Sequence, residues 1–139
     1  MDTFRIVVIS DTHKDFLSLR KIAERHIQNA DLFIHLGDLE EDVKKLKALY
    51  PNLPVRQVRG NCDFGSKLKT VDTVEVGGVK IFFCHGHTMM VGAGTGLLEQ
   101  AAREAGCKIA LFGHTHVSCC RYQEGLYVMN KSDRSHVVL

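Results

Sequence analysis

The sequence predicts an α/β fold in which buried strands alternate with amphipathic helices. A continuous apolar run rich in β-branched residues, typical of a strand buried on both faces, occurs at 4–10, and further strands are predicted at 31–38, which is also buried, and at 54–61. Between them, residues 15–30 carry apolar side chains at helical spacing, and residues 39–51 form a second helical segment that ends at its proline. Because strands that alternate with helices pair in parallel through right-handed crossovers, the first half of the chain is predicted to form a parallel sheet.

The second half of the sequence predicts an antiparallel arrangement. Residues 70–87 contain two β-rich runs around Gly77 and Gly78, which is the pattern of a hairpin. A helix over 96–106 follows, and then a strand over 108–116. The remaining residues read as a second hairpin, which turns at a Glu-Gly pair, and a final short strand.

Length and composition are those of one ordinary globular unit. The chain has 139 residues, of which 45% are hydrophobic and 24% charged, and no repeat or linker divides it, so residues 1–139 are expected to form one domain. The net charge of +2 is scattered without a polybasic block, which argues against sequence-specific nucleic acid binding and against a membrane surface. The N-terminus has no signal-peptide pattern, and the five cysteines lack a C-x-x-C, so a cytoplasmic protein with reduced thiols is expected.

Polar residues interrupt the apolar pattern just after five of the predicted strands. Any one of them has an ordinary explanation, since a lone histidine is usually a surface or core residue and "GD" and "GN" are common turn dipeptides. Five such coincidences at equivalent positions favour a site, because α/β sheets build their sites beyond the carboxyl ends of strands. The residues are Asp11 and His13, Gly37 and Asp38, Gly60 to Asp63, His85 and His87, and His114 and His116.

These side chains are suitable ligands for transition metals. Carboxylate, imidazole and amide oxygen donors without a thiolate pattern fit Mn, Fe, Zn, Ni or Co better than a structural zinc site. His114 and His116 are two residues apart, so in an extended segment both imidazoles point to the same side. Seven donors suit two ions ~3.5–4 Å apart that share a carboxylate, the arrangement used for in-line displacement at phosphorus. The donors are Asp11, His13, Asp38, Asn61, His85, His114 and His116.

In their order along the chain, the motifs D-x-H, G-D, G-N-x-D, H-G-H and G-H-x-H resemble those of the calcineurin-like metallophosphoesterases. The "GNCD" form and the short chain resemble the small prokaryotic phosphodiesterase branch, and the resemblance extends from Ile6 to about Asn130. It implies a four-layer α/β/β/α sandwich of two mixed sheets flanked by helices, with metals at the strand ends. It also implies hydrolysis of a small phosphate ester, such as a nucleotide or another diester, by attack of a metal-bridging hydroxide on phosphorus.

The resemblance also implies a role for each donor. Manganese is the expected metal, with Ni, Fe, Zn or Co as alternatives. Asn61 would also donate a hydrogen bond to the phosphate, whereas His87 would either contact the scissile phosphate or be an orienting or exposed loop residue. Asp63, next to Cys62, is expected to orient neighbouring groups rather than to bind metal. The first metal would be held by Asp11, His13 and His116, the second by Asn61, His85 and His114, with Asp38 bridging both.

The sequence departs from the family pattern in two places. The wider family has a histidine after G-N that acts as general acid or transition-state clamp, whereas this chain has Cys62, as the small branch often does, so the acid role is vacant. After Asn130 the branch usually has a Pro-Gly-Ser segment, and "NKSDRSHVVL" replaces it here. The family pattern therefore does not predict one wall of the substrate pocket in this chain, or any homo-oligomer interface built from that wall.

Two other classes of function stay open beside the enzyme. The chain could be a non-catalytic protein-interaction scaffold on the same fold, as in the retromer subunit that resembles this family, or a nucleotide sensor. Scaffolds tend to lose metal ligands, and all seven positions are filled here, which favours the enzyme. The sequence also predicts the environment of two further residues. Cys84 is expected to be buried, and His35 is expected to lie in the core or beside the ligands.

Overall fold

The computed structural model describes residues 4–9, 16–37, 40–60, 63, 67–89, 91, 94–113, 119–130 and 136–138. The elements are β1 (Ile6–Ile9), α1 (Phe16–His26), β2 (Leu32–His35), α2 (Glu40–Leu49), β3 (Val55–Gln57), β4 (Val71–Val76), β5 (Val79–Cys84), η1 (His87–Met89), α3 (Gly96–Glu104), β6 (Ile109–Phe112), β7 (Cys119–Gln123), β8 (Leu126–Asn130) and β9 (His136–Val138).

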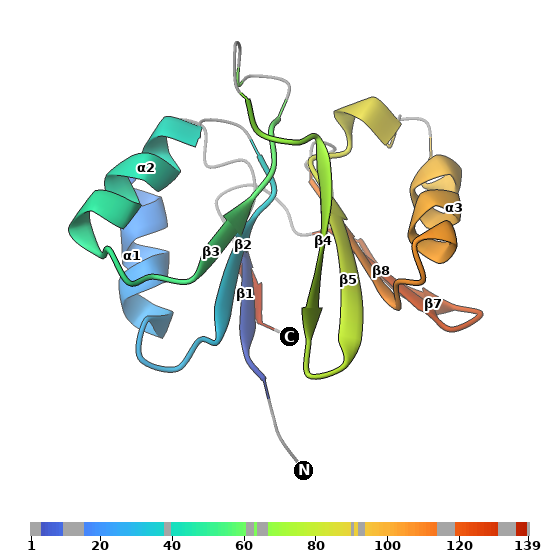
Figure 1. Cartoon of the computed structure of the whole chain (residues 1–139), viewed down its shortest axis with the longest axis horizontal. Coiled ribbons are helices and arrows are strands. Elements are labelled where there is room, and N and C mark those ends of the chain that lie inside the picture. The colour runs from blue at the N-terminus through green and yellow to red at the C-terminus, as the bar shows by residue number, and fades with distance from the viewer. Residues whose placement is uncertain are drawn as a thin grey trace.

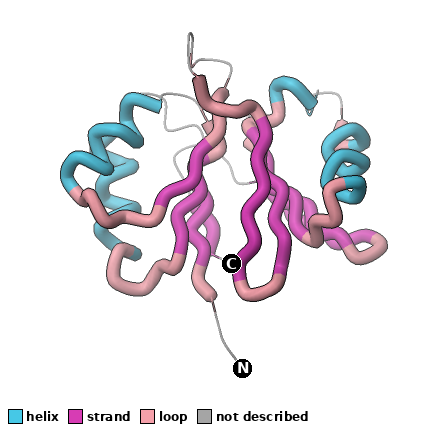
Figure 2. Tube along the Cα trace, viewed as in Figure 1, coloured by secondary structure: helices cyan, strands magenta, loops and turns pink. Residues whose placement is uncertain are grey.

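The elements are arranged in four layers (Figure 1). Two sheets face each other, with α1 and α2 on the outer side of the first and α3 on the outer side of the second. Figure 2 shows the same order by colour, with the magenta strands inside and the cyan helices outside. The predicted α/β/β/α sandwich is therefore confirmed. None of the helices in the described ranges is long and apolar enough to cross a membrane.

The first sheet has the strand order β3-β2-β1-β9. β1 pairs with β2 and β2 with β3 in parallel, as the alternation of strands and helices predicted. β9 adds an antiparallel edge beside β1, which makes the sheet mixed. Alternate residues of β1 serve different layers: Val7 and Ile9 pack with the α1 and α2 side chains, whereas Ile6 and Val8 face the second sheet.

The second sheet has the order β4-β5-β6-β8-β7. Its two hairpins were predicted, and the turn between β4 and β5 has positive φ at Gly77 (59°) and Gly78 (81°), as a type I′ turn requires. The expectation of an antiparallel second half is wrong at its centre, because β6 pairs in parallel with both β5 and β8. The helix α3 lies between β5 and β6 in the chain and provides the crossover that makes them parallel.

The core is divided into three apolar clusters that hold the four layers together. Phe83 of β5 and Leu111 of β6 are fully buried against Ile34 of β2, which joins the two sheets. On the outer side of the second sheet, Leu98 of α3 packs in the same cluster as Cys84. Large side chains buried in this way each contribute about 1.5–3 kcal/mol relative to an exposed position.

Cys84 and Cys120 are expected to differ sharply in reactivity. Cys84 is buried, as predicted, and this burial raises the pKa of its thiol to about 12, so the reactive thiolate is nearly absent at neutral pH. Cys120 is exposed on the edge strand β7. In a mapped alkylation experiment at pH 8, Cys120 should react within minutes and Cys84 only after denaturant is added. Rapid labelling of Cys84 in the folded protein would contradict its burial in this core.

Candidate metal centre

The described ranges contain three of the predicted site residues, His85, His87 and Asp63. His85 and His87 come directly after β5, and Asp63 follows β3. Within the described part of the chain, no group of three or more His, Cys, Asp and Glu side chains could hold a metal ion. The other predicted site residues lie outside the described residues: Asp11, His13, Asp38, Asn61, Cys62, His114 and His116.

Hydrogen bonds join the strand ends that lead into these positions. The Leu36 N–H donates to the Ile9 carbonyl (2.8 Å) and links the ends of β1 and β2. The Leu36 carbonyl in turn accepts from Nδ1 of His85 (2.9 Å), which brings in the end of β5. The Gly113 N–H donates to the His85 carbonyl (2.9 Å), which adds the end of β6. The predicted ligands that come next in the sequence are Asp11 after Ile9, Asp38 after Leu36, and His114 after Gly113.

Gly37 brings the segment after β3 to the same place. A Cβ atom on Gly37 would lie 2.8 Å from the Gly60 nitrogen and 3.0 Å from Cβ of His85, so these three residues pack without room for a side chain. Gly37 also has φ of +105°, which favours glycine. Gly60 directly precedes Asn61 in the sequence. Five strand ends therefore meet in one region of the molecule.

The imidazole of His85 has a fixed tautomer. The ring is fully buried, and its Nδ1 faces a carbonyl oxygen, which can only accept, so Nδ1 carries the proton. In the neutral ring the lone pair then lies on Nε2. Histidines that bind metal almost always donate the other ring N–H to a carbonyl or carboxylate in this way. The arrangement at His85 therefore fits a divalent transition-metal ion.

His87 lies beside His85 at the start of η1. The two ring centroids are 5.4 Å apart and the ring planes are tilted by 57°, so the imidazoles are neighbours without being stacked. Gly86 between them has φ of +110°, and a Cβ atom there would come within 2.6 Å of the Val91 side chain. The chain thus turns sharply after His85, and His87, which is partly exposed, borders the region that His85 faces.

The carboxylate of Asp63 binds back to Gly60, three residues earlier in the chain. Its Oδ2 accepts from the Gly60 N–H (2.9 Å), and the Asp63 N–H donates to the Gly60 carbonyl (3.2 Å). Asp63 is 7% exposed. These two bonds fix Asp63 relative to Gly60 in the segment after β3.

Two groups at this site were not predicted from the sequence. The Leu36 carbonyl orients His85, and a backbone carbonyl has no signature in the sequence. Nδ1 of His35 accepts from the Gly37 N–H (3.2 Å). His35 was expected in the core or beside the ligands, and it is buried, but its spacing from Gly37 carried no recognised signal.

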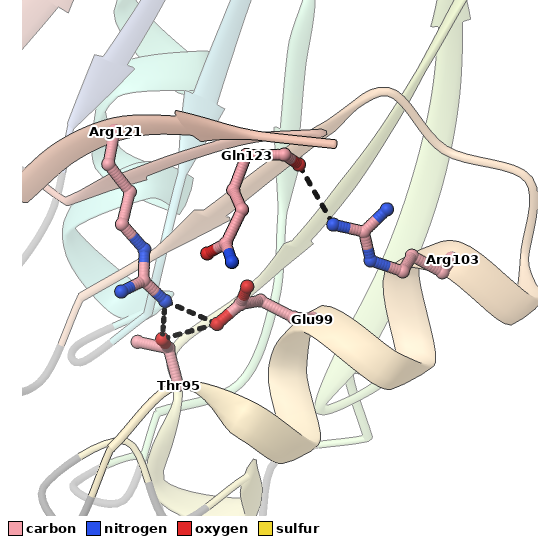
Figure 3. A network of polar contacts seen from close by, with 5 residues as sticks. All are labelled: Thr95, Glu99, Arg103, Arg121 and Gln123. Atoms are coloured by element: carbon pink, nitrogen blue, oxygen red, sulfur yellow. Dashed lines mark hydrogen bonds and ion pairs between the residues drawn. The ribbon is translucent and has the colours of Figure 1, made fainter. Parts of the chain in front are cut away.

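A separate polar network ties α3 to the β7–β8 hairpin (Figure 3). The Arg121 guanidinium of β7 bonds to the Thr95 hydroxyl and the Glu99 carboxylate at the start of α3. Arg103 of α3 donates to the carbonyl of Gln123 (2.9 Å) in the same hairpin. The network therefore fastens α3, which follows the H-G-H motif in the sequence, to β7, which follows G-H-x-H.

One apolar surface pocket of about 380 Å³ lies away from this region, at the end of the first sheet where β3 begins. The predicted ligands follow the carboxyl ends of the strands, whereas this pocket lies at the amino end of β3. It has no part in the candidate metal centre. It is lined by Ile27, Leu49, Tyr50, Pro51, Asn52, Leu53 and Pro54.

The fold and the converging strand ends define a protein of the metallophosphoesterase class. The domain model described as "Calcineurin-like phosphoesterase superfamily domain" matches residues 4–131, and the chain belongs to this family. Among curated proteins it is 33% identical over 126 residues to the probable metallophosphoesterase YsnB of Bacillus subtilis, covering 90% of this chain and 72% of that protein. It is 25% identical to the phosphodiesterase MJ0936 of Methanocaldococcus jannaschii, covering 93% of this chain and 83% of that protein.

Comparison with solved structures identifies the same fold. A predicted phosphoesterase from Streptococcus pneumoniae superimposes with a TM-score of 0.79 at 28% identity, covering 96% of this chain and 74% of that one. The Vps29 protein of Entamoeba histolytica, crystallised with Zn²⁺, superimposes with a TM-score of 0.73 at 23% identity, covering 94% of this chain and 74% of that one. The second similarity shows the shared fold alone.

Proposed function

We propose that this protein is a binuclear metal-dependent phosphodiesterase of the cytoplasm, in which residues 1–139 act as one catalytic domain. The observation that carries the proposal is the joining of five strand ends through Leu36, His85, Gly113 and the contact of Gly37 with Gly60. The residues in contact each lie within two positions of a predicted ligand or, in the case of His85, are that ligand. A site assembled from five separate segments requires that each segment is held in place, and these contacts hold the five segments together.

The two ions would be held as the family resemblance implies, with Mn as the expected metal and Ni, Fe, Zn or Co as alternatives. Bound at this site, they would supply the Lewis acidity and the activated water needed for in-line attack at phosphorus. Asp38 would bridge the ions. The remaining ligands would be Asp11, His13 and His116 on one ion and Asn61, His85 and His114 on the other.

The chain's own residues would orient the substrate and the ligands. The bond from His85 to the Leu36 carbonyl supports an Nε2 that is ready to bind metal. The two bonds between Asp63 and Gly60 would keep the Asn61 amide directed towards the phosphate. His87, whose ring centroid lies 5.4 Å from that of His85, would contact the scissile phosphate group. Cys62 is a poor proton donor, so esters with acidic leaving groups would be the better substrates.

The substrate class is a small phosphate diester, either a nucleotide or another diester. The curated relative from Methanocaldococcus jannaschii is named as a phosphodiesterase, which supports diesters over monoesters. The metals and Asn61 would recognise the phosphate rather than the groups attached to it, so the identity of the alcohol depends on the surrounding loops.

Hydrolysis of bis(p-nitrophenyl) phosphate should depend strictly on metal. Protein stripped with a chelator and reconstituted with Mn²⁺ should release p-nitrophenol, a second chelation should abolish the activity, and added Mn²⁺ should restore it. Hydrolysis that persists in excess chelator would contradict the proposal. Protein that binds metal but hydrolyses no ester in a panel of diesters and monoesters would instead indicate the scaffold or the nucleotide sensor.

A further inference from the structure

We propose that His35 is a positioning residue that holds the Gly37 turn and thereby sets the affinity of the site for its metals. The inference rests on the proposed function, because the predicted bridging ligand Asp38 comes directly after Gly37. His35 itself would bind neither metal nor substrate. It would act only through the backbone of the turn.

The geometry of His35 is that of a side chain closing a turn. It is the last residue of β2 and is 3% exposed, and its Nδ1 accepts from the N–H of Gly37, two residues further along the chain. Asn and Asp side chains close turns with the same spacing, through an oxygen that accepts from the N–H two residues on. Because Nδ1 accepts here, the neutral ring carries its proton on Nε2.

Gly37 needs such an anchor more than other residues would. Glycine populates a wide range of φ and ψ values, so a glycine at this position does not by itself fix the direction in which the chain leaves β2. Its observed φ is +105°, and a Cβ atom there would come within 3.0 Å of Gly60 and His85. A bond to its N–H from a buried ring selects one conformation out of that range. The direction in which the chain continues from Gly37 would then be fixed.

The magnitude of the effect follows from the behaviour of groups that orient metal ligands. Removing such an outer partner typically lowers metal affinity by about 10–100-fold. His35 acts one residue further from the metal than a direct partner of a ligand. It also controls the backbone rather than a single side chain, and a backbone shift moves the ligand as a whole. We therefore expect an effect within the same range.

Two variants separate positioning from simple packing. His35→Leu fills the buried space but cannot accept a hydrogen bond, whereas His35→Asn places an oxygen where it can accept from the Gly37 N–H. Calorimetric titration of each metal-free protein with Mn²⁺ gives the affinity and stoichiometry, and thermal unfolding of the same samples gives the stability. We expect His35→Leu to weaken Mn²⁺ binding by about 10–100-fold and His35→Asn to restore it to within about threefold of the parent.

Several outcomes would overturn the inference. A folded His35→Leu protein that binds Mn²⁺ like the parent would do so, and so would a His35→Asn protein that binds as weakly as His35→Leu. If His35→Leu does not fold, His35→Phe keeps the ring volume without an acceptor and is judged by the same criterion. A parent protein that binds no Mn²⁺ would refute the proposed function itself, whereas a parent that binds two ions with unaffected variants would refute only the role of His35.

Discussion

Replacing Asp38 with Ala is expected to lower kcat/KM for an aryl phosphodiester by on the order of 10³-fold or more. Asp38 is the one side chain expected to hold both ions, so its loss would remove a ligand from each of them. A loss of several kcal/mol in transition-state stabilisation corresponds to a rate factor of this size. The fold should survive the change, since Asp38 comes after the last residue of β2 in the sequence.

His87→Ala is the matched comparison for Asp38→Ala. Losing a hydrogen bond to a charged phosphate costs about 1.5–3 kcal/mol, so the expected decrease in kcat/KM is about 10–100-fold. Steady-state kinetics on both variants, with thermal unfolding to verify that each is folded, provide the measurement. Equal losses from the two substitutions would argue against a bridging role for Asp38.

Gly37→Ala should be among the most destabilising single substitutions in the chain. A Cβ atom there would lie 2.8 Å and 2.9 Å from the backbone N and Cα of Gly60, and backbone atoms cannot move aside as a flexible side chain can. The positive φ of +105° adds strain for a residue with a side chain. Together, the strain and the overpacking should cost about 3 kcal/mol or more of unfolding free energy. Metal binding should be lost with it, because Gly60 and His85 are displaced.

Gly78→Ala provides the control for backbone strain alone. Gly78 also has a positive φ, of +81°, but no atom lies within 4 Å of a Cβ built there. We expect a loss of only about 1–2 kcal/mol and unchanged metal binding. Urea unfolding of both variants gives the comparison. If Gly37→Ala is no more destabilising than Gly78→Ala, the close packing at the strand ends is not as described.

The fold was predictable wherever its signals are local. The alternation of buried strands and helices identified the parallel pairing of β1, β2 and β3, and the Gly77-Gly78 pair identified the hairpin. The insertion of β8 between β6 and β7 was not predicted, because it depends on pairing between segments that are distant in the chain. β3 is also shorter than the run 54–61, since the chain leaves the strand after Gln57 and approaches Gly37 at Gly60.

The candidate site was predictable as a set of residue types but not as a geometry. Histidine and carboxylate side chains after strands can be read from the sequence, and His85 lies where the strand ends meet. The groups that hold it there are backbone atoms of Leu36 and Gly113, and no residue pattern predicts these contacts. The same holds for the bond between His35 and Gly37, whose importance depends on the packing of Gly37 against Gly60 from the segment after β3.

The number of metal ions bound per chain tests the central claim most directly. Metal-free protein should be saturated with Mn²⁺, freed of excess by gel filtration and analysed by inductively coupled plasma spectrometry together with amino-acid analysis. The proposed ligand set predicts two ions per chain, and His26→Ala, which changes a residue at the far end of α1, should also bind two. One ion or none per chain at saturation would contradict the binuclear centre.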